Sequence, residues 1–183
     1  MYKKVILKDV VRVPPDRFNE DLKEAILAIL RESFAGLWEK DLGLILSVMD
    51  VQEVGKGKII PGDGAAYYDV EYKVLTYDPV IHEIVEGEIA EILEFGAFIR
   101  LGPVDGLVHV SQITNDFISF DSKQRTLTAK ESNRILKEGD KVRARIVTIS
   151  KKKDGAKIGL TLRQPGLGKF EWIEEDLKKE GSS

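Results

Sequence analysis

The sequence predicts a small α+β domain over residues 1–80, followed by an all-β barrel of five strands over residues 81–183. Two observations support this division. Within the first eighty residues, three stretches have the composition or the alternation of strands, and a fourth has apolar residues at helical spacing. After Pro79 the pattern changes to short strands separated by turns. A chain of 183 residues is long enough for two such domains, each burying a core of its own.

The first domain is expected to begin with a long strand over residues 2–13, which is rich in Val and Ile and ends at Pro14-Pro15. A helix should follow, because apolar residues recur at i, i+3, i+4, i+7 and i+8 and so share one face. These residues are Leu22, Ala25, Ile26, Ile29 and Leu30. Asp16 or Asn19 can cap the start of this helix, and Gly36 can end it.

Two further strands, over residues 44–54 and from residue 68 to about residue 74, complete a strand–helix–strand–strand order of RNP-like type. The Gly-rich segment 55–64 between them should be a loop. It lacks the Gly-Lys-Ser/Thr ending of a phosphate loop and does not lead from a strand into a helix. Because apolar side chains at a loop tip usually need a partner surface, Ile59 and Ile60 predict a contact surface.

The second domain should contain strands over residues 86–93, 97–101, 105–110, 141–149 and 157–162. The long link between the third and fourth strands, residues 114–136, is polar and is expected to be irregular, with room for a helical turn. Five strands with a longer link at that point have the order of an OB fold, a five-stranded barrel that binds oligonucleotides. Residues 171–180 predict a short acidic helix around Trp172, Ile173 and Leu177.

Two phenylalanines mark the second strand of this barrel as a candidate binding surface. Ala97 and Ile99 take the core-facing parity, which leaves Phe98 pointing outward, and Gly96 allows a bulge that could bring Phe95 onto the same surface. Bases stack on such aromatic rings. The alternative is that Phe95 plugs the end of the barrel and Phe98 packs under residues 114–136. His109 would share the outward face with Phe98, or it could be merely exposed.

A block of positive charge follows, because residues 123–163 carry 13 Lys and Arg against 4 Asp and Glu, although the whole chain has a net charge of −3. Alternation places cations on the outward parity of the last two strands and in the turn that joins them. The candidate contacts are Arg143, Arg145, Lys151, Lys152, Lys153 and Lys157. Such residues can form a solvated face. Beside surface aromatics, however, they match the positive track and stacking platforms of a single-strand binder.

The composition argues against several other functions. The chain has no cysteine, so disulfides, thiolate zinc sites and cysteine nucleophiles are excluded. His82 and His109 are far apart and lack a carboxylate cluster at ligand spacing, which argues against a metal site. Because no Ser has a His/Asp arrangement beside it, we expect neither catalysis nor a cofactor. The N-terminus has neither the pattern of a signal peptide nor that of a membrane span.

Five segments of the second domain resemble the S1 RNA-binding domain in order and spacing. They are Gly87-Glu88-Ile89, Phe95-Gly96-Ala97-Phe98, Gly106-Leu107-Val108-His109-Val110-Ser111, Lys137-Glu138-Gly139-Asp140-Lys141-Val142 and Ile158-Gly159-Leu160-Thr161-Leu162. The resemblance implies an RNA surface formed by the two Phe, the His, and a basic and an acidic residue around the last turn. Lys157 stands at the basic position, whereas Ser150 stands where the acid is expected.

The first domain resembles the E-prime family of archaeal RNA polymerase subunits, the counterpart of the seventh subunit of eukaryotic polymerases. The resemblance rests on Val11-Arg12-Val13-Pro14-Pro15, the helix after it, the segment Gly57-Lys58-Ile59-Ile60-Pro61-Gly62-Asp63-Gly64 and Tyr72-Lys73-Val74-Leu75. It implies a non-catalytic, cytoplasmic stalk subunit. Its tip domain would dock on core RNA polymerase near the clamp, and its S1 barrel would meet emerging single-stranded RNA. We predict that the docking contact is the loop with the apolar tip, through Lys58, Ile59, Ile60, Pro61 and Gly62.

The resemblance also implies a heterodimer with a second, smaller stalk protein, called F in archaeal RNA polymerases, that binds alongside both domains. The linker over residues 78–85 is a candidate contact for this small stalk partner, because Val80, Ile81 and Ile84 form an apolar stretch between two domains. Two alternatives remain open at this point. One is an exoribonuclease or RNA-processing enzyme with an S1 appendage, although residues 1–80 are too few for a nuclease domain. The other is a translation factor with an S1 domain.

Overall fold

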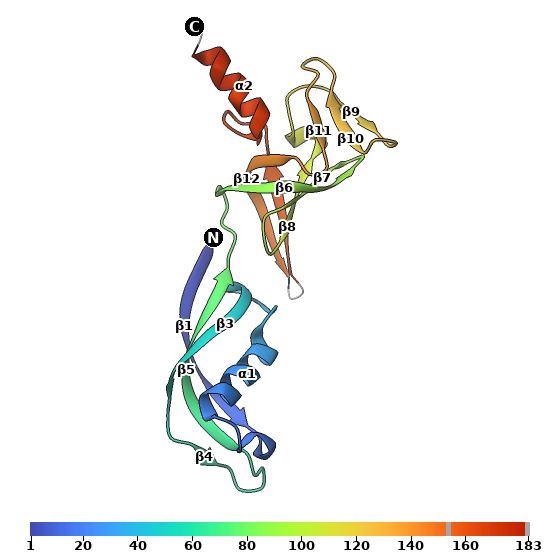
Figure 1. The fold of residues 1–183 in the computed structure, drawn as a ribbon. Helices are drawn as coiled ribbons and strands as arrows, with labels where there is room; N and C mark the ends of the chain where they lie inside the picture. Colours follow the sequence, from blue (N-terminus) through green and yellow to red (C-terminus); the bar gives the residue numbers. More distant parts are fainter. Residues whose placement is uncertain (153–154, 182–183) are drawn as a thin grey trace. The chain divides into compact units, whose positions relative to one another are not determined.

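The computed structural model describes residues 1–152 and 155–181 of the chain (Figure 1). The chain forms two compact units, and the main boundary between them lies between Asp78 and Pro79. The first is the α+β domain and the second is built around a β-barrel, which confirms the predicted fold class. Within the described residues, no helix combines the length and the apolar character that a membrane span requires.

The first unit is an antiparallel sheet with a helix on one face. Its elements are β1 (Tyr2–Val13), η1 (Pro15–Arg17), α1 (Leu22–Phe34), β2 (Trp38–Glu39), β3 (Gly43–Val54), β4 (Lys58–Ile59) and β5 (Ala66–Tyr77). The strands lie in the order β1-β5-β3-β2, and β4 pairs with β5 at one end. Ile26 and Leu30 of α1 pack against Val48, Val70 and Val74 of the sheet, so the amphipathic helix and the alternating strands share one core.

The helix begins at a different residue from the one expected. Asp21, rather than Asp16 or Asn19, caps α1: its Oδ1 accepts hydrogen bonds from the backbone N–H groups of Lys23, at 3.0 Å, and Glu24, at 3.1 Å. Asp16 lies instead in η1, a 3-10 turn that starts at Pro15. Capping depends on where the chain enters the helix, and that entry point is set by the turn after the two prolines rather than by the composition of the segment.

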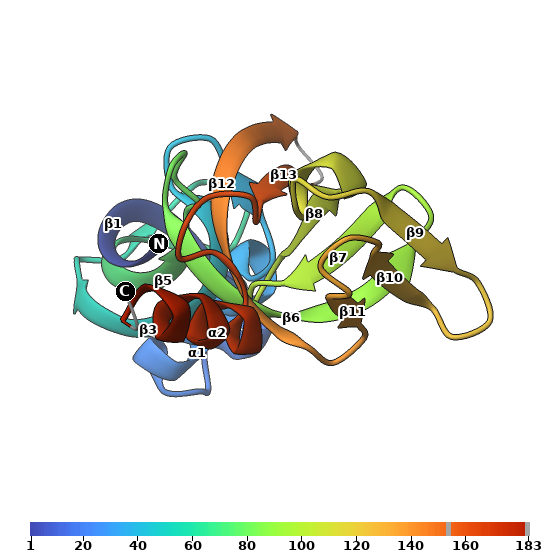
Figure 2. The same cartoon turned by 90° about the horizontal axis from the view of Figure 1, so that it is seen from above.

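The second unit is a closed barrel followed by a helix (Figure 2). Its main elements are β6 (Ile84–Leu93), β7 (Gly96–Arg100), β8 (Asp105–His109), η2 (Val110–Gln112), β12 (Lys141–Lys152), β13 (Gly155–Thr161), β14 (Gly168–Lys169) and α2 (Phe170–Glu180). The sheet order is β13-β8-β7-β6-β12-β14, and β12 also pairs with β13, which closes the barrel. The five predicted strands are therefore present in the predicted order.

The barrel core consists of the residues at the inward parity of each strand, among them Ile89, Ile99, Val108, Ala144 and Leu160, all at most 1 % exposed. Strand β7 passes very close to β8 at Gly96. A Cβ atom at this position would lie 2.2 Å from the carbonyl oxygen of Val108, so only glycine fits.

The segment expected to be irregular forms a second small sheet. Strands β9 (Ile118–Asp121), β10 (Thr126–Ala129) and β11 (Ile135–Lys137) pair antiparallel in the order β11-β10-β9. Leu127 and Leu136 are 2 % and 0 % exposed and belong to the barrel core. The strands were missed because each has at most four residues, which is too short for alternation to be recognised in a polar stretch.

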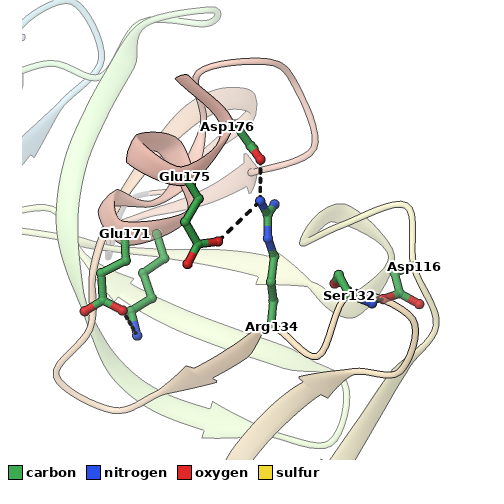
Figure 3. Close-up of polar contacts among 7 residues, drawn as sticks. Asp116, Ser132, Arg134, Glu171, Glu175 and Asp176 are labelled. Atoms are coloured by element: carbon green, nitrogen blue, oxygen red, sulfur yellow. Dashed lines mark hydrogen bonds and ion pairs between the residues drawn. The ribbon is translucent and has the colours of Figure 1, made fainter. Parts of the chain in front are cut away.

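Ion pairs join this small sheet to the last helix (Figure 3). Arg134, in the loop between β10 and β11, reaches Asp176 and Glu175 of α2, with N–O distances of 2.5 and 3.8 Å, and its guanidinium lies 5.5 Å from the ring centre of Trp172. Asp116 caps the same loop, and the backbone N–H of Ser132 lowers the pKa of its carboxyl group. Residues 114–136 are therefore an ordered part of the second unit.

Candidate nucleic-acid interface

A groove with a volume of about 620 Å³ runs along the outer surface of β7, β8, β12 and β13. Phe95, Phe98, His109 and Lys157 all line it, although they come from three separate segments of the sequence. Most of the groove wall is apolar, with Leu107 and Val147 between the polar groups. The structure thus places both aromatic residues, the histidine and one of the predicted cations on a single surface.

The two phenylalanines are available to a ligand. Phe95 is 47 % exposed, and Phe98 is half-buried in the groove. Phe120, from residues 114–136, packs against the barrel core, whereas Phe98 lines the groove. Both rings therefore present area to the groove, as the stacking interpretation requires.

In the antiparallel register of β7 and β8, His109 is paired with Gly96 and Phe98 with Leu107, so His109 and Phe98 lie two residues apart along the strands and on the same face. The backbone N–H of Ser111 donates to Nδ1 of His109 at 3.2 Å, and the Ser111 hydroxyl lies 2.8 Å from the same nitrogen. Because Nδ1 accepts, the neutral ring carries its proton on Nε2. That arrangement leaves an N–H donor on the ring of a residue that lines the groove.

The predicted cations do not all reach the groove. Lys157 lines it, Lys151 and Lys152 are exposed at the end of β12, and Lys153 lies outside the described residues. Arg143 instead pairs with Glu86 at 2.9 Å and stacks at 5.4 Å on Phe170.

Arg145 does not line the groove either. It is half-buried, and its Nε is buried with no hydrogen-bond partner among residues 1–152 and 155–181. The groove faces the second half of β12, from Val147 to Ser150, whereas both arginines lie in the half that pairs with β6.

Sequence reasoning missed three polar residues of the groove, which are Asp105, Gln112 and Thr148. Asp105 supplies a carboxylate on a surface where Ser150 stands at the position expected for an acid. Nothing in the local pattern marks Asp105, because it enters the groove only through the pairing of β8 with the far end of the chain. That pairing is parallel and joins Gly106 to Ile158.

The loop over residues 55–64 is anchored at its base. The guanidinium of Arg12 donates to both carboxylate oxygens of Asp63, at 2.7 and 3.0 Å, and the hydroxyl of Tyr67 donates to the same group. These hydrogen bonds, that of Arg12 first, lower the pKa of Asp63 to about 2. The adjacent tip leaves Ile59 69 % and Ile60 48 % exposed.

The linker between the two units is also apolar and exposed. Val80, Ile81 and Ile84 are 42 %, 48 % and 51 % exposed. Side chains of this kind can be scattered singly over any surface, but three within five residues form a compact patch. The linker patch (Val80, Ile81 and Ile84), the loop tip and the groove differ in their chemistry.

Both parts of the chain match families of known proteins. Residues 8–64 match the SHS2 domain found in the N terminus of Rpb7p and Rpc25p, and residues 78–161 match the S1 RNA binding domain. The chain is 42 % identical to DNA-directed RNA polymerase subunit Rpo7 of Saccharolobus solfataricus, over 97 % of this chain and all of that protein. It is also 34 % identical to RNA polymerase III subunit RPC8 of Saccharomyces cerevisiae, over 52 % of this chain and 45 % of that one.

Proposed function

The chain belongs to the Rpo7 family of DNA-directed RNA polymerase subunits, and from this premise we propose that it is a non-catalytic stalk subunit that holds emerging single-stranded RNA in the groove of its S1 domain. The full-length similarity to polymerase subunits favours this role over that of a translation factor or an RNA-processing enzyme. A polymerase subunit of archaeal type would work in the cytoplasm, beside the DNA that is being transcribed.

The observation that carries the proposal is the composition of the groove. Phe95 and Phe98 offer stacking surfaces, His109 offers a hydrogen-bond donor and Lys157 offers a charge for a phosphate, all within one groove of about 620 Å³. Stacking accepts any base, so the expected preference for sequence is weak. The direct test is binding of a labelled single-stranded RNA to the intact chain and to variants of these residues.

The anchored loop is proposed as the contact with core polymerase, near the clamp. Ile59 and Ile60 present apolar area, and Lys58 adds a charge on the short strand β4. Pro61 and Gly62 form the turn behind them, in which Gly62 adopts a φ of +91°. Because the Arg12–Asp63 pair holds the loop in place, docking would not need to order it first.

The linker patch is proposed as part of the contact with the small stalk partner. Covering Val80, Ile81 and Ile84 would remove exposed apolar area from water, which favours association. We expect a stable heterodimer when the two chains are mixed, and a weaker one when Ile81 is replaced by Ser. Size-exclusion chromatography with light scattering measures both. A chain that stays monomeric at every ratio of the two proteins would exclude this partner.

A further inference from the structure

A second groove of about 590 Å³ lies on the same unit, beyond the end of β13, and its lining includes Asn115, Arg134, Arg163, Gln164 and Trp172. Residues that are close together in the chain line the two grooves. Gln112 lines the first groove and Ile113 the second, and along the strand direction Leu160 lines the first and Leu162 the second. The two grooves therefore adjoin across the junction of η2 and the end of β13.

Arg163 stands at this junction. Its Nη1 donates to the carbonyl oxygen of Ser111 at 3.1 Å, and its Nε donates to Oδ1 of Asn115 at 2.8 Å. Ser111 is also the residue whose hydroxyl contacts the ring of His109, at 2.8 Å. One residue thus separates Arg163 from the histidine of the first groove, and the guanidinium is held in a defined orientation at an exposed position.

The charge of Arg163 is the unusual feature. The hydrogen bonds of its guanidinium all go to uncharged oxygens, and among residues 1–152 and 155–181 it forms no ion pair with a carboxylate, although Asp176 and Glu180 also line the second groove. The neighbouring Arg134, by contrast, is paired with Asp176 and Glu175 of α2. A planar guanidinium that is positioned by neutral acceptors and open to solvent is suited to a phosphate group, because its attraction for an anion is not cancelled.

We propose that Arg163 binds a phosphate of the RNA strand as it leaves the aromatic groove, and that the strand continues into the second groove. This inference rests on the proposed function, because the ligand is the same single-stranded RNA. It adds one contact residue and the path of the strand to that function. Bases stack on Phe95 and Phe98, and the RNA backbone then passes Arg163. The nucleotides that follow lie between β13, the 114–136 segment and α2. Asn115 and Gln164 offer amide groups to those nucleotides.

The test is fluorescence anisotropy of labelled oligouridylates of about three and about twelve nucleotides, within or just below the range that single OB folds accommodate. For the long RNA, Arg163→Gln should make the slope of log affinity against log salt shallower by about 0.7. The affinity of the variant relative to the wild type should therefore be about fivefold lower at 0.1 M salt than at 1 M salt. The short RNA, which is confined to the aromatic groove, should bind the variant as it binds the wild type.

Two controls separate charge from structure. Asn115→Ala removes a hydrogen-bond partner of Arg163 and an amide that is offered to the RNA but keeps the charge, so the affinity should fall at every salt concentration while the salt slope stays at the wild-type value. Arg125→Gln removes the same charge from an exposed residue that is paired with Glu138, and it should leave the slope unchanged as well. Circular dichroism and thermal melting check that each variant is folded.

The possible outcomes are distinct. An unchanged slope in Arg163→Gln overturns the phosphate site, and an equal loss with short and long RNA overturns the path into the second groove. If the salt slope falls as much in Arg125→Gln as in Arg163→Gln, the effect comes from the net charge of the protein, which also overturns the phosphate site. If instead Arg163→Gln has the expected effect but Phe98→Ala has none, the proposed stacking surface fails and the phosphate site stands.

Discussion

Replacing Phe98 with Ala tests the RNA-binding groove most directly. The ring lines the groove while it is also half-buried against the sheet, so one of its surfaces remains available to a base. Stacking of one base on an aromatic side chain contributes about 1–3 kcal/mol, which corresponds to a loss of roughly 5- to 150-fold in affinity. The loss should be the same at every salt concentration, because stacking releases no counterions.

A salt series separates this contribution from the electrostatic one. In fluorescence anisotropy with a labelled single-stranded RNA, Phe98→Ala should shift the whole plot of log affinity against log salt downward without changing its slope. Lys157→Ala should instead reduce the slope by about 0.7, the value expected for one phosphate contact on a single strand. The two residues line the same groove, so a difference in the type of effect reflects the chemistry of each contact.

Phe117 provides the matched control. It is another aromatic residue of the same unit, 67 % exposed, with the ammonium of Lys130 at 4.7 Å from its ring centre, and it does not line the groove. Phe117→Ala should leave the affinity unchanged. If Phe98→Ala binds RNA like the wild type while its melting temperature shows an intact fold, Phe98 is only a packing residue and the stacking surface is wrong.

Three further predictions concern the other parts of the chain. Replacing Ile59 and Ile60 with Ser should weaken incorporation into polymerase in a competition assembly without lowering the melting temperature, because both side chains are exposed. Incorporation at wild-type stoichiometry would mean that the loop makes no contact with polymerase. An NMR titration should give the carboxyl of Asp63 a pKa of about 2, so its contribution to stability is complete above about pH 4 and is lost as the pH falls toward 2. Tyr67→Phe should raise this pKa, because it removes one of the two hydrogen bonds that lower it. An ordinary pKa in the wild type would mean that the contact of Asp63 with Arg12 and Tyr67 does not form. Leu136→Ala should lower the free energy of unfolding by about 2–5 kcal/mol in denaturant titrations, since the side chain is fully buried. A negligible change would mean that the small sheet does not pack against the barrel core.

The main strands and their faces could be predicted because a strand carries its own pattern. Side chains alternate between two faces with a period of two residues, so a run such as Lys141 to Ile146 shows which residues are buried before any partner strand is known. Val142, Ala144 and Ile146 are indeed fully buried. The apolar face of α1 was visible for the same reason at a period of 3.6 residues.

The groove was predicted only in part, for a reason that Arg143 illustrates. Alternation correctly directed it away from the barrel interior, but an outward residue can face any neighbour, and here that neighbour is Glu86 on β6. Whether an outward cation meets RNA or a carboxylate depends on which strand lies beside it. That depends in turn on the register between segments far apart in the chain, here residues 84–88 and 141–145.

The sequence by itself determined the order of the main elements, the buried parity of each long strand and the presence of surface aromatics, because these follow from local periodicity and residue chemistry. Only the tertiary structure decided which polar groups meet. The parallel pairing of β8 with β13 brings Asp105 and Lys157 to one groove, and the pairing of β1 with β5 and the return of the loop bring Arg12 to Asp63. Such contacts join residues about fifty positions apart, and no local pattern records them.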